Sequence, residues 1–307
     1  MSKKGIILAG GNGSRLYPTT QSISKHSLPI YDKPMIYYPL TTLLLAGVRQ
    51  ILIITSPNEV KTFKALLKDG SQWGIEISYD VQEKPDGIAS AIIIAENFIK
   101  KESFFLILGD NIFYGNNLIN ILQSAINNKK GASIFGYNVL NPKRYGIVET
   151  NKKGKPIKLT EKPKKTLSTL AITGLYYYDN KAIGYAKKLK KSARGEYEIT
   201  DLNKCYLKNN NLNLEIMGRG FAWFDAGTPK SLLNAKQFIS VIQDRQNFKI
   251  ACPEEIVYSK NYINKKQLKK IINFYGESEY GKYLKMVVKW KNLERYITPK
   301  LIMVMMK

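Results

Sequence analysis

The first segment with clear chemical character is the glycine-rich stretch GIILAGGNGSRL at residues 5–16. A short apolar run enters a turn with three glycines, and Ser14 and Arg15 follow it. Glycines let the backbone approach a ligand closely, and successive free N–H groups form a concave anion site. Arg15 adds a permanently charged fork suited to phosphate. The segment is neither a Walker A loop nor a dinucleotide-binding GxGxxG, because no Lys-Ser/Thr ending and no immediate helix follow. We therefore predict a phosphate site of another type.

The loop SKHSLP at residues 24–29 carries the next candidate cation. Lys25 follows the glycine loop closely enough to reach the same triphosphate, although a lysine in a polar loop is usually only solvated. His26 is the only histidine of the chain. A single histidine excludes a catalytic triad with a spare base and a zinc site built from a histidine cluster.

Two aspartates are candidate ligands for a divalent cation. Asp110 follows the strongly apolar segment 104–108, and Asp225 follows the aromatic residues of MGRGFAWFDAGTP. A buried strand that ends in an acid commonly holds a divalent cation bound to phosphates. The alternatives are an Asx turn or a helix cap for Asp110, and the N-cap of a helix beginning near Pro229 for Asp225.

Two further segments offer groups for a base and a sugar. Gln82 lies at the end of a strand-like run with Gly87 just beyond it, and its amide offers both the donor and the acceptor that a pyrimidine edge requires. Glu161 and Lys162 end the segment PIKLTEK. Lys162 could hold a sugar phosphate while Glu161 accepts sugar hydroxyls. Taken alone, each pair is more typical of a solvated strand end.

The elements that must position these residues alternate between strand and helix. Short apolar runs predict buried strands at 6–9, 51–55, 75–81 and 104–108, and helical periodicity predicts helices at 34–46, 59–68 and 88–98. The pattern indicates an α/β fold with a Rossmann-like, mixed but mostly parallel central sheet flanked by helices. Ligands of such sheets bind at the carboxyl ends of the strands.

The second half of the chain is first rich in strands and then helical. Strands are predicted at 132–139, 145–150, 156–162 and 172–179, and helices at 180–189, 199–208 and 232–246. The Lys-rich stretch after residue 265 is predicted to begin as helix and ends in the apolar LIMVMMK. An exposed LIMVMM would favour aggregation, so this end is expected to be packed or to form an interface.

Charge and cysteine content set limits on the class of protein. The chain of 307 residues has 48 Lys plus Arg against 24 Asp plus Glu, a formal charge of +24. Such an excess attracts polyanions, but the lysines are scattered as a compositional bias would scatter them, so nucleic acid is not an expected partner. Cys205 and Cys252 lie far apart without metal-ligand spacing. With no signal peptide core and no apolar run long enough for a membrane span, we expect a cytoplasmic protein without membrane attachment.

Taken together, the motifs resemble those of bacterial glucose-1-phosphate thymidylyltransferases. The shared segments are GIILAGGNGSRL, YDKPMIYYPL, LGDNIFYG, RYGIVE, LTEKP, SARGEYEITD and GRGFAWFDAGT, in the same order along nearly the whole chain. The resemblance implies a nucleotidyltransferase domain at 1–250, with a nucleotide-binding half at 1–130 and a sugar-binding half at 131–250. It further implies a C-terminal helical extension at 251–290, which would serve an interface or regulation. The tail at 291–307 has no counterpart and stays unassigned.

The resemblance also implies roles for individual residues. The nucleoside triphosphate would lie against Leu8, Gly10, Gly11, Gly13, Ser14, Arg15, Lys25, His26, Gln82, Gly87 and Asp110. The glucose 1-phosphate would lie against Gly146, Glu161, Lys162, Ile172 and Arg194. Asp110 and Asp225 would share Mg²⁺. Family members are typically homotetramers with a second, regulatory nucleotide site, which here would involve Tyr114, Gly115, Arg219 and Glu255.

Some positions depart from the family pattern. His26 and Ser27 stand where Gln and Leu are usual, which could shift nucleotide affinity or choice. Asn116 and Ser259 stand where His and Arg are expected, so the regulatory site is less well matched than the active site.

The implied reaction is Mg²⁺-dependent transfer of a thymidylyl group from dTTP to glucose 1-phosphate, a first step toward dTDP-deoxysugars such as dTDP-rhamnose. Arg15, Lys25, Lys162, Asp110 and Asp225 would act by positioning and charge neutralisation, without a protein nucleophile. The alternatives are the same chemistry with UTP or another sugar 1-phosphate, and a catalytically silent protein that binds nucleotides or polyanions.

Overall fold

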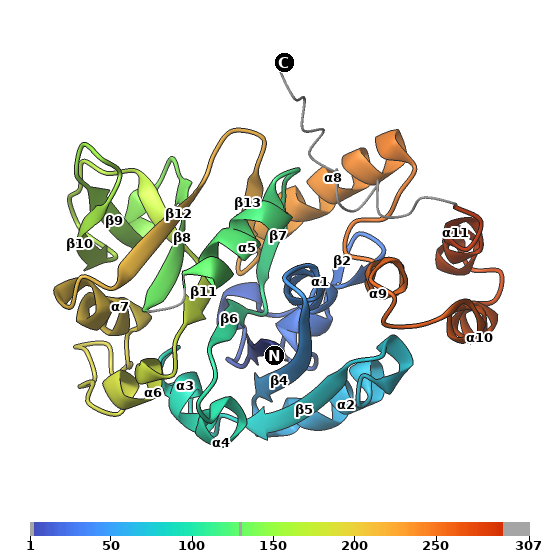
Figure 1. Cartoon of the computed structure of the whole chain (residues 1–307), viewed down its shortest axis with the longest axis horizontal. Helices are drawn as coiled ribbons and strands as arrows, with labels where there is room; N and C mark the ends of the chain where they lie inside the picture. Colours follow the sequence, from blue (N-terminus) through green and yellow to red (C-terminus); the bar gives the residue numbers. More distant parts are fainter. Residues whose placement is uncertain (1–2, 129–130, 291–307) are drawn as a thin grey trace, which may run out of the picture.

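A mixed sheet of nine strands runs through the computed structural model, which describes residues 3–128 and 131–290 (Figure 1). Its strands are β1 (Lys3–Ala9), β4 (Val48–Thr55), β5 (Glu76–Val81), β6 (Phe104–Leu108), β8 (Ala132–Asn138), β9 (Gly146–Thr150), β10 (Pro156–Glu161), β11 (Leu170–Tyr178) and β12 (Leu212–Met217). The order is β10-β9-β11-β6-β1-β4-β5, and β8 joins β11 to β12. The predicted α/β class with a mixed central sheet is confirmed.

One half of the sheet is parallel, and its strands β6, β1 and β4 are buried on both faces. Strands β6, β1, β4 and β5 pair in parallel, whereas β11 pairs antiparallel with β6 and β8. Parallel strands covered on both faces are continuous apolar runs rather than alternating ones. Neighbouring residues Ile6 and Ile7 illustrate this, because both are fully buried but belong to hydrophobic clusters on opposite faces.

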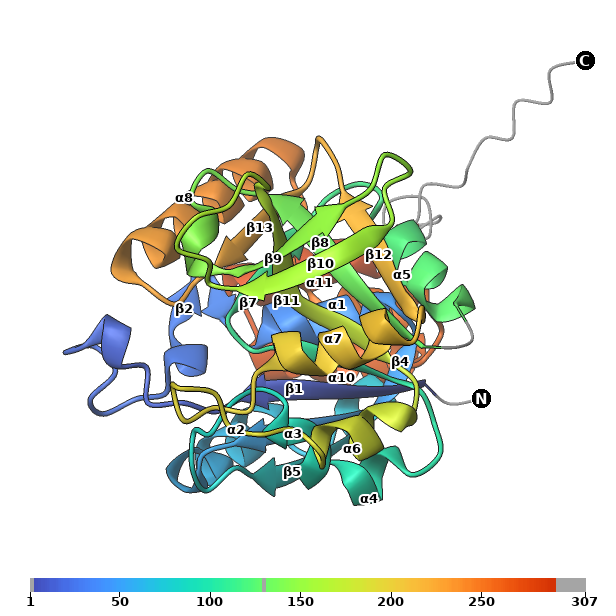
Figure 2. The same cartoon turned by 90° about the vertical axis from the view of Figure 1, so that its left-hand side faces the viewer.

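Helices cover both faces of the sheet. They are α1 (Tyr37–Leu45), α2 (Val60–Leu67), α3 (Ser90–Ile94), α4 (Glu96–Ile99), α5 (Leu118–Asn127), α6 (Lys181–Ala186), α7 (Ile199–Lys208), α8 (Pro229–Gln246), α9 (Pro253–Ser259), α10 (Lys265–Tyr275) and α11 (Glu279–Val287). Helices α1, α2, α5 and α9–α11 contribute to one cluster, and α3, α4, α6 and α7 to the other, whereas the buried apolar residues of α8 belong to a third cluster away from these two faces. In the side view, β9, β10 and α7 come to the front, with β1 running below them (Figure 2).

Short strands outside the main sheet were not predicted. β7 (Asn111–Tyr114) pairs antiparallel with β13 (Ala222–Asp225), and β2 (Pro29–Ile30) pairs with β3 (Lys33–Pro34). The prediction that Pro34 lies in the first turn of a helix is therefore wrong, because Pro34 pairs across the hairpin with Pro29 and α1 begins at Tyr37. The helix predicted at 88–98 is divided into α3 and α4 at Ala95.

The C-terminal helices pack onto the body of the protein. Ile256 of α9, Leu268 of α10 and Leu284 of α11 are buried in the same cluster as β1 residue Ile7. The predicted division of the chain near residue 250 stays a prediction, and the tail at 291–307 lies outside the described residues. No helix among the described residues is both long and apolar enough to cross a membrane.

Candidate active site

Two carboxylates meet at the carboxyl end of the sheet. Asp110 stands two residues after the end of β6, and Asp225 ends β13, where the β7–β13 pairing sets it opposite Asn111. The backbone N–H of Ala226 donates to the carbonyl of Asp110 across 3.0 Å. Both carboxylates line a cavity of about 450 Å³. Residues far apart in the sequence thus form one acidic pair inside a cavity.

Asp110 is buried and paired with a lysine. Its Oδ2 accepts a hydrogen bond from Lys25 Nζ at 2.6 Å, and its Oδ1 accepts one from Asn111 Nδ2 at 3.0 Å. Burial by itself would raise the pKa of Asp110, but the charge of Lys25 and these hydrogen bonds hold it well below its usual range. The partners of the side chain are Lys25 and Asn111, so the alternative of an Asx turn or a helix cap is not what the structure shows.

Asp225 has the opposite electrostatic environment. Burial and the neighbouring Asp110 charge raise its pKa, while Arg15 acts in the other direction. A Cβ at Gly227 would lie 2.6 Å from Arg15 Nη2 and 2.9 Å from Asp225 Oδ1, so this glycine makes room for the guanidinium beside the carboxylate. The N-cap of α8 is Thr228, not Asp225.

The glycine loop joins this acidic pair from β1. Gly11 and Gly13 have φ values of 93° and 60°, a region that favours glycine. Thr20 Oγ1 donates to the carbonyl of Gly13 at 2.8 Å and holds the turn. Ser14 and Arg15 lie in a short 3₁₀ turn (Ser14–Leu16) directly after it, and Arg15 lines the cavity.

His26 lies behind the loop, buried against the strand ends. Its ring is close to the backbone after β6, because a Cβ at Gly109 would lie 2.7 Å from His26 Cδ2. Burial, reinforced by the charge of Lys25, lowers the pKa of His26 to about 3. The only imidazole of the chain is therefore neutral near pH 7 and faces the protein interior.

Gln82 and Gly87 lie together at the end of β5. Gln82 Nε2 donates to the carbonyl of Gly87 at 3.1 Å and to Ser90 Oγ at 2.5 Å. Gln82 Oε1 lies 3.2 Å from where a Cβ at Gly10 would be, which brings the amide to the glycine loop. The same position would lie 3.9 Å from Leu8 Cδ1, so Leu8 belongs to this corner as well.

The opposite side of the cavity is built from the second half of the chain. Gly146, Glu161, Lys162, Ile172 and Arg194 all line it. Glu161 Oε2 accepts from Thr200 Oγ1 at 2.5 Å, and Arg194 Nη2 donates to Glu198 Oε2 at 2.6 Å. Lys162 has a φ of 41°, which L-residues rarely adopt. Glu161, Lys162 and Arg194 thus bring three charged side chains to the same cavity as the carboxylate pair.

The sequence reasoning missed several cavity residues. Asn111 holds three elements together, since its Oδ1 accepts from Trp223 Nε1 at 2.6 Å and from the backbone N–H of Gly174 at 3.0 Å. Thr200, Glu198 and Arg144 also line the cavity. They stand inside or beside motifs already singled out, GDN, EYEITD and RYGIVE, so the signal was present but the partners were not readable from spacing.

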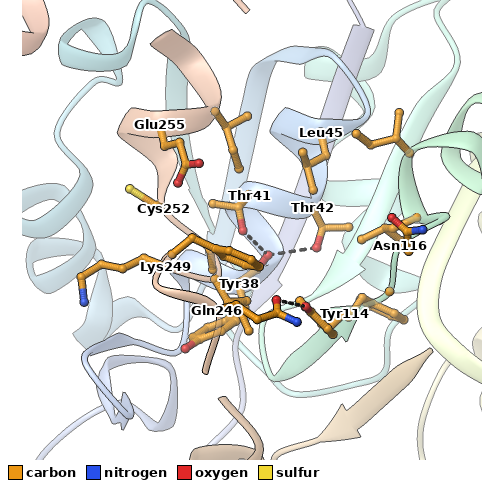
Figure 3. A pocket seen from close by; sticks show the side chains of 18 of the residues that line it. Tyr38, Thr41, Thr42, Leu45, Tyr114, Asn116, Gln246, Lys249, Cys252 and Glu255 are labelled. Atoms are coloured by element: carbon orange, nitrogen blue, oxygen red, sulfur yellow. Dashed lines mark hydrogen bonds between the residues drawn. The ribbon is translucent and has the colours of Figure 1, made fainter. Parts of the chain in front are cut away.

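A second cavity of about 450 Å³ lies between α1, the end of β7 and the start of α9 (Figure 3). Of the four residues predicted for a regulatory site, Tyr114, Gly115 and Glu255 line it, as does Asn116. Among the described residues Arg219 is not one of its lining residues, although the adjacent Gly220 is. Burial raises the pKa of Glu255 to about 7.

The comparisons with known proteins agree with this geometry. The family model described as nucleotidyl transferase matches residues 4–241. A glucose-1-phosphate thymidylyltransferase of Xanthomonas campestris pv. campestris is 52% identical, with 94% of this chain and 97% of that protein covered. One of Mycobacterium tuberculosis is 49% identical, with 92% and 97% covered.

Solved structures show the same fold. A crystal structure of a candidate glucose-1-phosphate thymidylyltransferase from Bacillus anthracis matches with a TM-score of 0.72 at 41% identity, covering 77% of this chain and 95% of that one. A UDP-glucose pyrophosphorylase bound to UDP-glucose matches with a TM-score of 0.69 at 23% identity, covering 79% of this chain and 100% of that one. The second likeness concerns the fold alone.

Proposed function

The chain belongs to the nucleotidyl transferase family, in the branch of the glucose-1-phosphate thymidylyltransferases, and we propose that it transfers the thymidylyl group of dTTP to glucose 1-phosphate. One observation carries the proposal. A single cavity holds an acidic pair, Arg15 from the glycine loop, and a wall with Glu161 and Lys162. The product, dTDP-glucose, would supply routes to dTDP-deoxysugars such as dTDP-rhamnose.

The reaction is an in-line displacement at phosphorus. A phosphate oxygen of glucose 1-phosphate attacks the α-phosphorus of dTTP, a P–O bond forms, and the bond to the β-phosphate breaks to release pyrophosphate. The nucleophile is already anionic near neutral pH, so no protein base is required. This agrees with the position of His26, whose pKa of about 3 and complete burial keep it from exchanging protons near pH 7.

The nucleotide end would be read by backbone and amide groups. The turn at Gly11 and Gly13 would present N–H groups to the triphosphate, with Arg15 beside it. The amide N–H groups of Gln82 donate hydrogen bonds to the Gly87 carbonyl and to Ser90 Oγ. The carbonyl oxygen of the Gln82 side chain would then accept from the N3–H of thymine. A base that presents an acceptor at that position would be disfavoured.

The sugar end would be read by a hydrogen-bonded carboxylate. Thr200 orients Glu161, whose remaining acceptor capacity suits sugar hydroxyls. A Cβ at Gly146 would lie 3.1 Å from Glu161 Oε2, so glycine keeps this corner open for the sugar. Lys162 and Arg194 would hold the phosphate of the nucleophile against the negative charge of dTTP.

The carboxylate pair suits a divalent cation. Nucleotidyltransferases of this family generally use a divalent metal, and we infer that Mg²⁺ is held here by Asp110 and Asp225. The fit rests on two hard oxygen donors at adjacent strand ends, with Asp225 destabilised as an anion by burial and by Asp110. Bound there, the cation would neutralise charge on the phosphates.

The second cavity is proposed to bind a regulatory nucleotide. Tyr114 offers an aromatic ring, and its hydroxyl donates to Gln246 Oε1 at 3.2 Å. Glu255 and Lys249 supply charge at the cavity wall (Figure 3). Equilibrium dialysis with a radiolabelled thymidine nucleotide should give two sites per chain, and Tyr114→Ala should remove one of them without removing the other.

Assembly and location are also proposals. We infer a homo-oligomer of four chains from the resemblance to the family, and Leu233 and Val241, which are 53% and 57% exposed on α8, are candidates for its contacts. Light scattering should then give a mass of about four chains. The two cysteines are free, Cys252 buried and Cys205 half-buried, which suits the reducing cytoplasm where dTTP is made.

A panel of substrates tests the proposed function. Purified protein is mixed with Mg²⁺, glucose 1-phosphate and one of dTTP, UTP, CTP, GTP or ATP, and pyrophosphate release is measured. Preference for dTTP, lost on addition of EDTA, is the expected result. Preference for UTP would be consistent with the fold and the metal pair but would show that the protein is specific for uridine rather than thymidine nucleotides. Silence with all five, and with other sugar 1-phosphates, would favour a nucleotide-binding protein without catalysis.

A further inference from the structure

Arg144 is a cation of the cavity to which the sequence analysis gave no role, although it begins the motif RYGIVE. It ends a 3₁₀ turn (Pro142–Arg144) before β9, and its Nη2 lies 3.4 Å from Asp225 Oδ2. Its guanidinium also lies 5.5 Å from the centre of the Tyr145 ring. The side chain is 40% exposed, so it can leave this contact without opening a buried void. Arg144 therefore places beside Asp225 of the carboxylate pair a positive charge that can move.

Each member of the carboxylate pair therefore has its own protein cation. Lys25 Nζ contacts Asp110 at 2.6 Å, and Arg144 contacts Asp225 at 3.4 Å. No cluster of three or more His, Cys, Asp or Glu suited to a metal occurs in the described part of the chain. Mg²⁺ is typically bound by one or two carboxylates together with substrate phosphates, and it gives up its waters reluctantly. A free metal ion must therefore compete with a protein cation at each of the two carboxylates.

We propose that Arg144 is a further substrate-binding residue, which neutralises Asp225 in the free protein and turns to a phosphate of the nucleotide when the divalent cation enters. Lys25 would act in the same way from Asp110. The proposal rests on the metal pair of the proposed function. Triphosphate and metal then bind with positive coupling, because the metal displaces the two side chains from the carboxylates and the phosphates accept them.

A purely structural ion pair makes a different prediction. If Arg144 served only to fix the loop before β9, its removal would alter stability and leave the coupling between metal and nucleotide unchanged. An exchangeable counter-ion affects both ligands in opposite directions: its loss frees Asp225 for the metal alone and removes a partner of the nucleotide. The sign of these two effects separates the two roles.

Manganese binding provides the measurement. Free Mn²⁺ is titrated against the full chain by electron paramagnetic resonance, without nucleotide and with dTTP, in the absence of glucose 1-phosphate so that no turnover occurs. The variants are Arg144→Met, Arg144→Lys and the matched control Arg194→Met. Arg194 lines the same cavity and its side chain is 38% exposed, but it pairs with Glu198 rather than with Asp225. Thermal unfolding of each variant verifies that it is folded.

Without nucleotide, Arg144→Met should bind Mn²⁺ about two- to fivefold more tightly than the wild type, as expected for loss of a partly exposed ion pair. With dTTP present, the same variant should bind Mn²⁺ and nucleotide about tenfold more weakly, through loss of a charged hydrogen bond to phosphate. Arg144→Lys should keep most of both properties, and Arg194→Met should leave the affinity for free Mn²⁺ unchanged.

Two results would overturn the inference. Unchanged Mn²⁺ affinity in Arg144→Met, with and without dTTP, would show that the residue is not a counter-ion of the site. An equal gain in Arg194→Met would show a general effect of cavity charge. In either case, wild-type protein that binds Mn²⁺ tightly with dTTP would leave the proposed function intact. Wild-type protein that takes up no Mn²⁺ even with dTTP would overturn the metal pair and this inference together.

Discussion

The second cavity should make the stability of the protein depend on pH through Glu255. This side chain is 6% exposed, and its Oε2 accepts from Tyr283 OH at 2.6 Å. Burial raises the pKa of Glu255 from 4.5 to about 7, although Tyr283 and Lys33 act in the other direction. Replacing Glu255 with Gln keeps a carbonyl acceptor for Tyr283 and removes the ionisation.

The size of the effect follows from the two pKa values. Below pH 4.5 the carboxyl is protonated in both states, and between pH 4.5 and about 7 the unfolded chain loses the proton that the folded protein keeps. The unfolded state then binds fewer protons, so the free energy of unfolding falls as pH rises through this window and levels off above it. At about 1.4 kcal/mol per pH unit, the total loss is about 3 kcal/mol.

Melting curves of the wild type and Glu255→Gln at pH 5 and pH 8 measure this. The two proteins should have similar Tm values at pH 5, whereas the variant should melt on the order of 5 °C higher at pH 8. Tyr283→Phe serves as a directional control, because it removes a donor that favours the ionised form, so the loss of stability should continue to higher pH and become larger in total. Equal differences between wild type and Glu255→Gln at both pH values would refute the reasoning.

Three further predictions concern the active site. Asp110→Asn and Asp225→Asn should each lower turnover by about a hundredfold or more with an unchanged circular dichroism spectrum. Near-normal turnover of either variant would show that the replaced aspartate is not a metal ligand. Lys162→Met should lower kcat/KM for glucose 1-phosphate by about a hundredfold while calorimetry shows dTTP binding retained; loss of dTTP binding instead would place Lys162 on the nucleotide. Gly227→Ala should lower kcat by about tenfold or more, because the added Cβ would lie 2.9 Å from Asp225 Oδ1 and displace that carboxylate. Gly218→Ala is the control and should leave kcat unchanged, because its added Cβ would have no atom within 4 Å. Equal kinetics of the two variants would show that the close approach at Gly227 is unimportant.

The strands of the sheet could be predicted from the sequence where both of their faces are buried. The runs that became β4 and β6 are apolar along most of their length, since both faces of a parallel sheet are covered. The pairing of β7 with β13 could not be predicted from the sequence. Each strand has only four residues and is defined by its partner, which stands more than a hundred positions away in the chain. Short strands of this kind depend on tertiary pairing rather than on local pattern.

Site residues could be predicted from the sequence where they belong to one short motif, but contacts between residues of two distant motifs could not. The glycine loop and the acid after β6 both show in short segments of sequence, and the structure brings them together. The contact of Thr200 with Glu161 and that of Arg144 with Asp225 join residues 39 and 81 positions apart. Such pairs are set by strand order, and strand order is what the sequence patterns left undetermined.

The composition of the cavity finally explains why the overall charge was a poor guide to function. The chain has 41 lysines and 7 arginines, yet the cavity is lined by three arginines and a single lysine, namely Arg15, Arg144, Arg194 and Lys162. A bias toward lysine across the chain would predict the reverse ratio. Arginine offers a planar fork with several fixed donors, which suits phosphates that must be held in line, whereas lysine offers one flexible charge. Three of the seven arginines thus line the cavity against one of the 41 lysines, and this enrichment marks the cavity better than the net charge of +24 does.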